Sequence, residues 1–394
     1  MTRTIILVTT QPFPFGMAST NRLRSLAVGL NKNGLKVRVL CLKPTSIEEN
    51  LIFLGDKNCG RYEGVDFEYT SITIRDSKSK PLKAIYIISG VLCSIIRILR
   101  LGRVEKINQI WVSFSTVAYI LTYFVVAKLV KSQFTLFRSE YPKLERNKLT
   151  MFLFDKLYSQ LLFKCFDNFV IMTTKLKEYF DDKKKSDAKS ILAPMTLDFS
   201  KYEFQRREIR SNREYIAYCG TMNFNKDGVD NLLRAFKLIS VQYPNLFLYL
   251  IGDLEGSRET LDLIDELEIS DKVIGTGYVT GDTYLNYLSE ARVLCLARPK
   301  TPQNENGFPS KLIDYLATGK PVVTTDTGEV SKYFKDDESI FFATAGDYMD
   351  FAKKLLSVLE NYDHSLSVGV KGRQVAMKNF DYISVTKRII SNLF

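Results

Sequence analysis

The sequence predicts an α/β protein with two halves, each built around a parallel sheet. Three observations support this prediction. The chain has 394 residues, which favours two domains over one. Its hydrophobic content of 45% and its charged content of 25% are those of folded globular proteins. Short apolar runs alternate with segments of helical periodicity, and a second series of this alternation begins at residue 215.

The first half opens with a βαβ pattern. Residues 4–10 (TIILVTT) predict a buried strand, and residues 21–34 have the apolar spacing of a helix that ends at Gly34. Residues 37–42 predict the next strand. A βαβ unit has parallel strands, and it places a ligand loop, here residues 11–19, at the carboxyl end of the first strand.

The same alternation continues through both halves. In the first half we expect strands at 67–74, 109–114, 134–138 and 170–173, and helices at about 83–101, 117–131 and 148–165. In the second half we expect strands at 215–219, 247–251, 272–274, 293–297, 321–325 and 339–343, and helices at 229–241, 260–267, 282–289, 310–317 and 347–359.

The polar stretch at residues 198–214 predicts a linker between the two halves. It separates a first domain at 1–197 from a second domain at 215–378. Residues 379–394 have apolar positions on one helical face. We expect this last helix to pack back on the first domain.

Basic residues are concentrated in the first half. Residues 1–200 contain 31 Lys and Arg against 17 Asp and Glu, a net charge of +14, whereas residues 201–394 contain 24 against 27. A positive surface suits an anionic partner, such as a membrane surface, a phosphorylated lipid or a nucleic acid. A basic surface that is only solvated is the alternative.

The cysteines and the N-terminus predict a cytoplasmic protein. The six cysteines lie far apart without a CxxC pair, which is typical of free thiols in a reducing compartment and not of a zinc or dithiol site. The apolar stretch at residues 4–8 is too short for a secretory signal.

A membrane-spanning segment is not expected, because no unbroken apolar run reaches 18 residues. The longest run, at residues 84–96, lies between Lys83 and three arginines that end at Arg103. Such a helix is suited to lie in a membrane interface. A buried helix with a basic end fits the same pattern.

Several enzyme classes lack their required residues. His364 is the only histidine and falls in a predicted loop, which argues against a Ser-His-Asp triad, a histidine zinc site and an HExxH protease. The sequence has no GxxxxGK[ST] phosphate loop and no GxGxxG after its first strand. It also has no Asp-x-Asp pair of the kind that holds a metal-bound nucleotide diphosphate.

Two loops of the second half carry residues suited to phosphate and hydroxyl groups. After the strand at 215–219, Gly220 permits close backbone approach and Lys226 precedes a helix. In residues 306–323 (NGFPSKLIDYLATGKPVV), Lys311 and Asp314 lie one turn apart near a helix start. A carboxylate in this position can accept hydrogen bonds from vicinal hydroxyls, as in dinucleotide-binding folds.

The order of these motifs resembles that of glycosyltransferase family 4, whose members have the GT-B fold. The resemblance covers nearly the whole chain, and residues 306–323 are its most specific part. The segments that carry it are, in order, residues 12–23 (PFPFGMASTNRL), 140–142 (EYP), 193–204, 218–239, 251–253 (IGD), 277–279 (GYV) and 306–323. The resemblance implies two Rossmann-like domains whose parallel sheets face each other across a cleft.

The resemblance also implies a reaction and a set of site residues. A sugar would move from a nucleotide diphospho-sugar with retention of configuration and without a bound metal or other cofactor. Lys226 would stabilise the leaving diphosphate, and Asp314 would hold the ribose. The other implied donor-binding residues are Gly16, Gly220, Thr221, Arg298, Asn306, Gly307, Phe308 and Lys311, and the implied acceptor or cleft residues are Arg22, Ser113 and Glu140.

The sequence departs from the family pattern at four places. The first loop keeps Gly16 but has Met17 where a second glycine is common. The family pairs two glutamates eight positions apart, whereas this chain has Asn306 and Asp314, with Glu305 adjacent. The arginine that many members carry before the phosphate-binding lysine is absent, and Arg298 or Lys311 is the candidate replacement. A histidine of the first domain is also absent, and Ser113 and Ser115 are the nearest polar candidates.

We therefore expect a retaining glycosyltransferase of capsule, exopolysaccharide or O-antigen synthesis. The basic first half favours a lipid-linked glycan acceptor and a peripheral location on the inner face of the membrane. A soluble glycan acceptor is the alternative. Two alternatives for the activity are a non-hydrolysing nucleotide-sugar 2-epimerase and a non-catalytic nucleotide-sugar-binding partner. Nucleic-acid binding is not expected, because the basic residues form no recognisable module.

Overall fold

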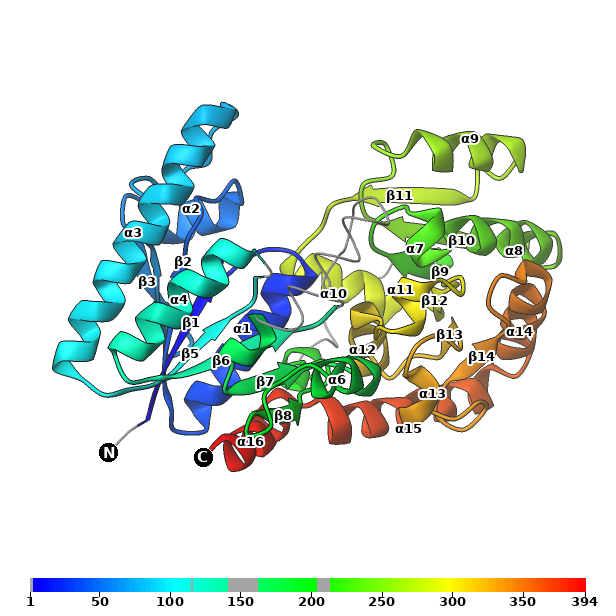
Figure 1. Ribbon diagram of the computed structural model, residues 1–394. Coiled ribbons are helices and arrows are strands. Elements are labelled where there is room, and N and C mark those ends of the chain that lie inside the picture. The colour runs from blue at the N-terminus through cyan, green and yellow to red at the C-terminus, as the bar shows by residue number, and fades with distance from the viewer. Residues whose placement is uncertain (1–2, 115, 141–161, 204–212) are drawn as a thin grey trace, which may run out of the picture. The chain divides into compact units, whose positions relative to one another are not determined.

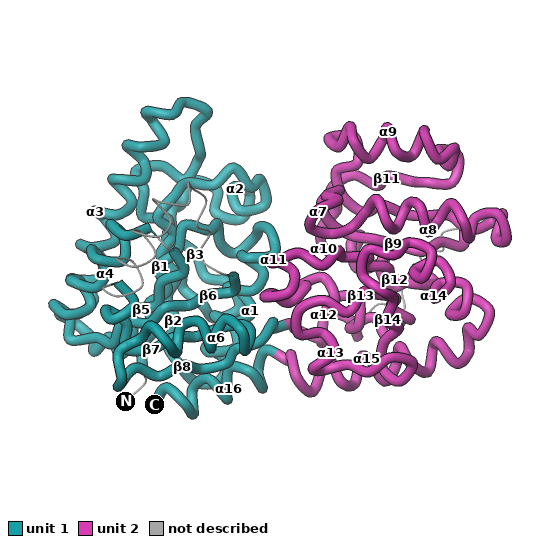
Figure 2. The backbone as a smooth tube through the Cα atoms, turned by 45° about the vertical axis from the view of Figure 1, so that its right-hand side comes forward, with its two compact units in different colours: residues 1–196, 382–394 teal, residues 197–381 magenta. Residues whose placement is uncertain are grey.

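The computed structural model describes residues 3–114, 116–140, 162–203 and 213–394. The chain divides into two compact units (Figure 2). Unit 1 contains residues 1–196 and 382–394, and unit 2 contains residues 197–381. The predicted domain limits are 197 and 379, and the observed divisions fall at 196/197 and 381/382. The predicted linker at 198–214 belongs to unit 2.

Unit 1 is built on a sheet with the strand order β3-β4-β2-β1-β5-β6-β7-β8 among the described residues. Its strands are parallel except for β3, which pairs antiparallel with β4. The strands are β1 (Thr4–Thr9), β2 (Lys36–Cys41), β3 (Cys59–Tyr62), β4 (Val65–Tyr69), β5 (Ile107–Val112), β6 (Gln133–Arg138), β7 (Asn168–Ile171) and β8 (Lys189–Leu192). The parallel order puts the loops that follow β1 and β5 at one edge of this sheet.

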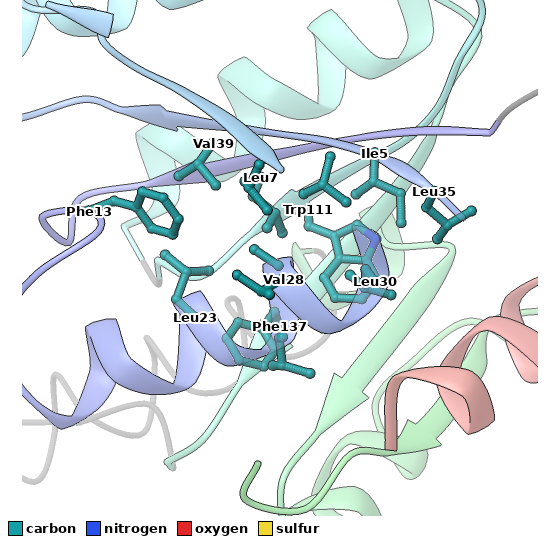
Figure 3. Packing of buried hydrophobic residues seen from close by; sticks show 14 of the residues in the cluster. Ile5, Leu7, Phe13, Leu23, Val28, Leu30, Leu35, Val39, Trp111 and Phe137 are labelled. Atoms are coloured by element: carbon teal, nitrogen blue, oxygen red, sulfur yellow. The ribbon is translucent and has the colours of Figure 1, made fainter. Parts of the chain in front are cut away.

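One face of this sheet is covered by α1 (Ala18–Lys32) and α16 (Tyr382–Leu393). Figure 3 shows the packing between α1 and the strands, with Trp111 and Phe137 among the buried side chains. The two helices cross closely, because a Cβ atom on Gly29 would lie 2.7 Å from the carbonyl oxygen of Tyr382. The C-terminal helix is therefore part of the core of unit 1.

The other face of the sheet is covered by α3 (Lys80–Val104) and α4 (Val117–Leu129). These two helices pack against each other (Figure 1). The remaining described helices of unit 1 are α2 (Glu48–Leu54), α6 (Thr174–Asp181) and the 3-10 helix η2 (Phe163–Cys165).

Unit 2 has a parallel sheet with the order β11-β10-β9-β12-β13-β14. Its strands are β9 (Glu214–Cys219), β10 (Leu246–Ile251), β11 (Val273–Gly277), β12 (Val293–Leu296), β13 (Val322–Thr325) and β14 (Phe341–Ala343). Its helices are η3 (Phe199–Tyr202), α7 (Phe224–Asp227), α8 (Val229–Gln242), α9 (Arg258–Glu266), α10 (Gly281–Glu290), α11 (Pro302–Glu305), α12 (Ser310–Ala317), α13 (Val330–Tyr333), α14 (Tyr348–Glu360) and α15 (Tyr362–Phe380). Strand order changes direction between β9 and β12, where doubly wound folds bind their ligands.

Some sequence expectations were wrong in detail. The strand expected at 67–74 ends at Tyr69, because it is the second strand of the short β3–β4 hairpin. The sequence did not indicate α2, α6, β8 or α15. His364 lies in the first turn of α15 and not in a loop. The helix expected at 148–165 falls mostly outside the described residues.

The expectation that no segment is long and apolar enough to span a bilayer was also wrong. By length and composition alone, α3 meets that requirement. The protein buries 17% of the most apolar 18-residue window of this helix. The sequence estimate counted unbroken apolar residues, whereas a helix tolerates Ser94 and Arg97 within an apolar stretch.

Candidate functional site

The candidate site of unit 2 lies at the carboxyl edge of its sheet, where a glycine directly follows each of β9 and β10. The backbone N–H of Gly220 donates to the carbonyl of Ile251. A Cβ atom on Gly252 would lie 2.2 Å from the carbonyl oxygen of Gly220, so the two loops pack backbone against backbone. This close packing fixes the path of the loop at residues 220–227.

Lys226 combines a fixed backbone with an exposed side chain. Its N–H donates to Asn223 Oδ1 over 2.8 Å, so Asn223 caps the short helix α7. Its carbonyl accepts from Arg298 Nε over 3.2 Å and from Asn304 Nδ2 over 3.0 Å. Its side chain has no ion-pair partner among the described residues. The loop therefore presents a cation to solvent from a well-held position.

Lys311 supplies a second cation from α12. Its Nζ lies 2.9 Å from Asp227 Oδ2 and donates to the hydroxyl of Tyr218 over 2.8 Å. Gly220, at a φ of +145°, leaves room for it, because a Cβ atom there would lie 2.0 Å from Lys311 Nζ. Burial lowers the pKa of Lys311, and the Asp227 carboxylate opposes that shift. The ammonium thus lies directly against the glycine loop.

Asp227 is buried beneath this loop and contacts both Lys311 and Thr221. Its carboxyl side chain is 5% exposed, and Oδ2 also accepts from Thr221 Oγ1 over 3.1 Å. Tyr218, which receives the hydrogen bond from Lys311, donates to the carbonyl of Thr221 over 2.6 Å. Buried charges are stable only when they are paired and hydrogen-bonded. Asp227 and Lys311 meet this condition together.

Asp314 lies one turn after Lys311 and is held by Tyr202. The Tyr202 hydroxyl donates to Asp314 Oδ1 over 2.5 Å. Burial, and then the Asp314 carboxylate, raise the pKa of Tyr202, so its hydroxyl stays protonated and can donate. The hydroxyl of the next residue, Tyr315, accepts from the N–H of Cys219, which fixes α12 to the end of β9. Asp314 is partly exposed.

Three residues expected to bind the donor contact mainly the protein itself. Arg298 is 5% exposed and holds the Lys226 carbonyl and the side chain of Asn304. Phe308 is 7% exposed and packs on Tyr333 and Phe380. Neighbouring residues bury both side chains almost completely, and their expected contacts with the donor stay a prediction. Asn306 Nδ2 donates to the carbonyl of Pro302 over 2.7 Å.

The remaining donor candidates are close to the glycine loop or to its neighbour. Thr221 is exposed apart from its bond to Asp227. The carbonyl oxygen of Gly307 lies 2.2 Å from the position of a Cβ atom on Gly328, so these two loops also pack backbone against backbone. Gly16 belongs to unit 1, where it precedes α1 and packs beside Thr20.

The candidates of unit 1 have different environments. Arg22 is 2% exposed, and its guanidinium donates to the carbonyls of Ala193 and Pro194 over 2.7 and 2.8 Å. The Arg22 guanidinium thus holds the backbone after β8, and its expected role at the acceptor stays a prediction. Ser113 Oγ lies 3.4 Å from Thr9 Oγ1, at the ends of the central strands. Glu140 is exposed, and residues 141–142 of its segment lie outside the described residues.

The arrangement in unit 2 is suited to a diphosphate. Lysine ammonium groups beside a glycine loop neutralise phosphate oxygens, and backbone N–H groups can approach them closely. The carboxylate of Asp314 is suited to accept from hydroxyl groups. Among the described residues, no cluster of three or more His, Cys, Asp or Glu side chains is placed to hold a metal ion.

Comparisons with known proteins bear on the fold and on the sequence of unit 2. Residues 200–375 match the family model for glycosyl transferases group 1, and every site residue of unit 2 named above lies in that range. The structure of Anabaena HepE in complex with UDP-glucose matches 99% of both chains with a TM-score of 0.71 at 12% identity. The chain has the GT-B fold.

Two curated relatives match this GT-B chain over part of their length. MMP alpha-(1->4)-mannosyltransferase of Mycolicibacterium hassiacum is 27% identical over 189 residues, which are 48% of this chain and 44% of that protein. The capsular polysaccharide biosynthesis glycosyltransferase CapM of Staphylococcus aureus is 24% identical over 186 residues, which are 47% of each protein. The chain thus spans less than half the length of both relatives.

Sequence reasoning missed Asp227, Tyr218 and Tyr202. Asp227 directly follows Lys226, but no local pattern shows that its partner is Lys311. Tyr202 lies in the segment 193–204 that resembles family 4, so its position was marked although its bond to Asp314 was not. Each of these three residues is polar, lies beside one of the motifs in the sequence and is buried in the structure.

Proposed function

We propose that the protein is a retaining glycosyltransferase that transfers a sugar from a nucleotide diphospho-sugar bound to unit 2. The observation that carries this proposal is the presence of two lysines at the glycine loop. Lys226 is exposed, and Asp227 holds Lys311 against Gly220. The fold and the glycosyl transferases group 1 match support it. HepE binds UDP-glucose in its structure, which supports a nucleotide-sugar donor here.

In this proposal the two lysines stabilise the leaving diphosphate. The bond between the anomeric carbon and the phosphate oxygen breaks, and the acceptor oxygen forms the new glycosidic bond on the same face of the sugar. The acceptor proton passes to the departing phosphate. Preorganised cations have their largest effect where charge develops in the transition state. Because two cations are available, the proposed reaction does not require a metal ion.

Asp314 and Asn306 have separate proposed roles in holding the donor. The Asp314 carboxylate accepts from the ribose hydroxyls, and Tyr202 fixes its orientation. Asn306, where family members have a glutamate, presents an amide that hydrogen-bonds sugar hydroxyls. Thr221 is uncharged and lies where many family members have an arginine. In this proposal Lys311 supplies the missing positive charge.

The proposed acceptor is a lipid-linked glycan of capsule, exopolysaccharide or O-antigen synthesis. The relative CapM is named for capsular polysaccharide biosynthesis, which supports this class of pathway. The charge of residues 1–200, 31 basic against 17 acidic, supports a location at the anionic inner surface of the cytoplasmic membrane.

The test is a panel of UDP, GDP, ADP and dTDP sugars, with a CMP sugar as the monophosphate control, incubated with the protein, membrane lipid extract and a chelator. Release of a free nucleoside diphosphate from one donor, absent in Lys226→Ala, supports a metal-independent transferase. Conversion of the donor to its 2-epimer supports the epimerase instead. A nucleotide that raises the melting temperature but is never consumed supports a non-catalytic binding protein. Product analysis of the anomeric configuration decides retention.

A further inference from the structure

The helix pair α3–α4 carries large apolar side chains on its outer side. In α3 they are Leu82, Ile85, Ile88, Leu92 and Ile96, and in α4 they are Leu121, Val125 and Leu129, with exposed fractions between 41% and 65%. We call these eight residues the apolar face. Their spacing of three or four residues puts them on one side of each helix. Scattered exposed apolar residues are ordinary, but a contiguous set marks an interaction surface.

The inner side of α3 packs on the sheet through Ile98, with Val91, Ile95 and Leu101 against the same core, and it also carries two small residues. Its buried residues are Gly90, Ser94 and Ile98. A Cβ atom on Gly90 would lie 2.0 Å from the carbonyl oxygen of Leu42, so no larger residue fits. Ser94 Oγ hydrogen-bonds the hydroxyl of Tyr123 of α4 over 2.5 Å. The helix is therefore fixed closely to unit 1 on its inner side and carries apolar side chains on its exposed side as well.

Basic residues outnumber acidic ones around the apolar face, where Lys83 and Arg97 pair with Asp76 and Glu68. Residues 77–139 contain ten Lys and Arg, and Glu105 is their only acidic residue. Arg100, Arg103, Lys128 and Lys131 are exposed and have no ion pair with a described Asp or Glu. Gly102 packs against Val130, so these four cations lie at the neighbouring C-terminal ends of the two helices. Apolar and basic groups therefore occupy one surface.

We infer that the apolar face inserts into an anionic bilayer, with the four cations at the level of the lipid phosphates. This inference deepens the proposed membrane location and rests on it. Apolar side chains enter the boundary of the acyl chains, and arginine and lysine side chains bind the head groups. A second copy of the chain is the less suitable occupant, because two such positive surfaces would repel each other. A membrane-spanning α3 would lose its contacts through Gly90 and Ser94 to the sheet and α4.

Vesicle flotation of the full chain tests the inference. The vesicles are phosphatidylcholine alone or mixed equally with phosphatidylglycerol, at low salt and at about 1 M salt, where charges are screened within ~3 Å. We expect binding to the mixed vesicles and a fraction that persists in high salt. The triple variant Ile85→Ser, Ile88→Ser, Leu92→Ser should lose this fraction by about tenfold or more. The matched control is Leu238→Ser, Val241→Ser, which removes exposed apolar residues from α8 of unit 2.

A fluorescent probe on the exposed Cys93 reports insertion directly. Cys93 adjoins Leu92, and the other exposed cysteine, Cys59, is replaced by Ser. Burial raises the pKa of Cys219 to about 12, so this thiol reacts slowly at neutral pH. With mixed vesicles we expect a blue shift from a polarity-sensitive dye on Cys93. We expect none from the dye on a Val241→Cys variant in which Cys59 and Cys93 are both replaced by Ser.

Three results would overturn the inference. Binding abolished by salt and unaffected by the triple variant would indicate surface charge alone, and would leave the membrane location standing. A dimer in lipid-free light scattering that the triple variant dissociates would identify a second copy as the occupant. No binding to either vesicle would remove the membrane location as well. Nucleoside diphosphate release by the triple variant is measured with a soluble acceptor. Release at the wild-type rate would show that the donor site works, whichever of the three results is found.

Discussion

Lys311 and Asp227 form an ion pair of 2.9 Å between Nζ and Oδ2. Asp227 directly follows Lys226, whose side chain is exposed. The pair joins α12 to the loop after β9, two segments that are far apart in the sequence. Because Asp227 adjoins Lys226, the pair fixes the backbone that carries one cation and the position of the other. In the proposed diphosphate site, a lysine from a neighbouring helix replaces the arginine that the local sequence lacks.

Removing either lysine should reduce transfer strongly. Lys226→Ala and Lys311→Ala should each lower kcat/KM for the donor by about 10²–10³, the effect of losing one preorganised donor to a developing anion. Lys353→Ala on α14 is the matched control, because Lys353 is exposed on another helix. Initial rates of nucleoside diphosphate release measure the effect. Equal activity of Lys311→Ala and the wild type would remove Lys311 from the donor site.

Asp227 and Lys311 should be thermodynamically coupled. Asp227→Asn and Lys311→Met should each lower the free energy of unfolding by about 1–3 kcal/mol, because each leaves a buried partner without its charge. The double variant should lose less than the sum of the two, with a coupling energy of about 0.5–3 kcal/mol. Urea unfolding of the four proteins gives this value. Additive losses would mean that the pair contributes nothing as a pair.

Alkaline pH should weaken donor use earlier than an ordinary lysine predicts. Burial lowers the pKa of Lys311 below its usual 10.5. Only the protonated lysine stabilises the diphosphate, so kcat/KM should fall as pH rises through this lowered pKa. In Lys311→Arg the guanidinium stays charged, and the fall should move to higher pH. Coincident pH profiles of the wild type and Lys311→Arg would assign the fall to another group.

Tyr202 should act on the donor through Asp314. In Tyr202→Phe, Asp314 loses a hydrogen bond of 2.5 Å, and we expect a several-fold rise in donor KM with a smaller change in kcat. Asp314→Asn should raise KM further, because it removes the charge that accepts from the ribose. Tyr348→Phe on α14 is the matched control, since Tyr348 is exposed. An unchanged KM in Tyr202→Phe would limit this bond to a structural role.

Arg22 should matter for stability and not for donor binding. Arg22→Met leaves the carbonyls of Ala193 and Pro194 without their buried donors, and should cost on the order of 3 kcal/mol in urea unfolding. Nucleotide-induced stabilisation should persist in the variant. Lys387→Met on α16, an exposed position, is the control. Full stability combined with lost transfer would return Arg22 to the acceptor site.

Local pattern was sufficient to predict most of the strands and helices and the two loops that carry Lys226 and Lys311. Apolar spacing and glycines act over a few residues, so the helix at 310–317 was predicted at its observed bounds. The β3–β4 hairpin was missed because its strands are short and β3 is largely exposed. The burial of Arg22 and Phe308 depends on contacts with residues distant in sequence, such as Pro194 and Phe380. Such contacts have no periodic signal.

The return of α16 to unit 1 sets an order for folding during synthesis. Chains leave the ribosome N-terminus first, and domains fold as they emerge. All strands of unit 1 are made before unit 2, but Tyr382, Ile389 and Leu393 of its core are made after it. Unit 2 can therefore complete its core first, while the α1 side of unit 1 stays uncovered. During that interval the nascent chain presents an apolar surface that a chaperone can recognise.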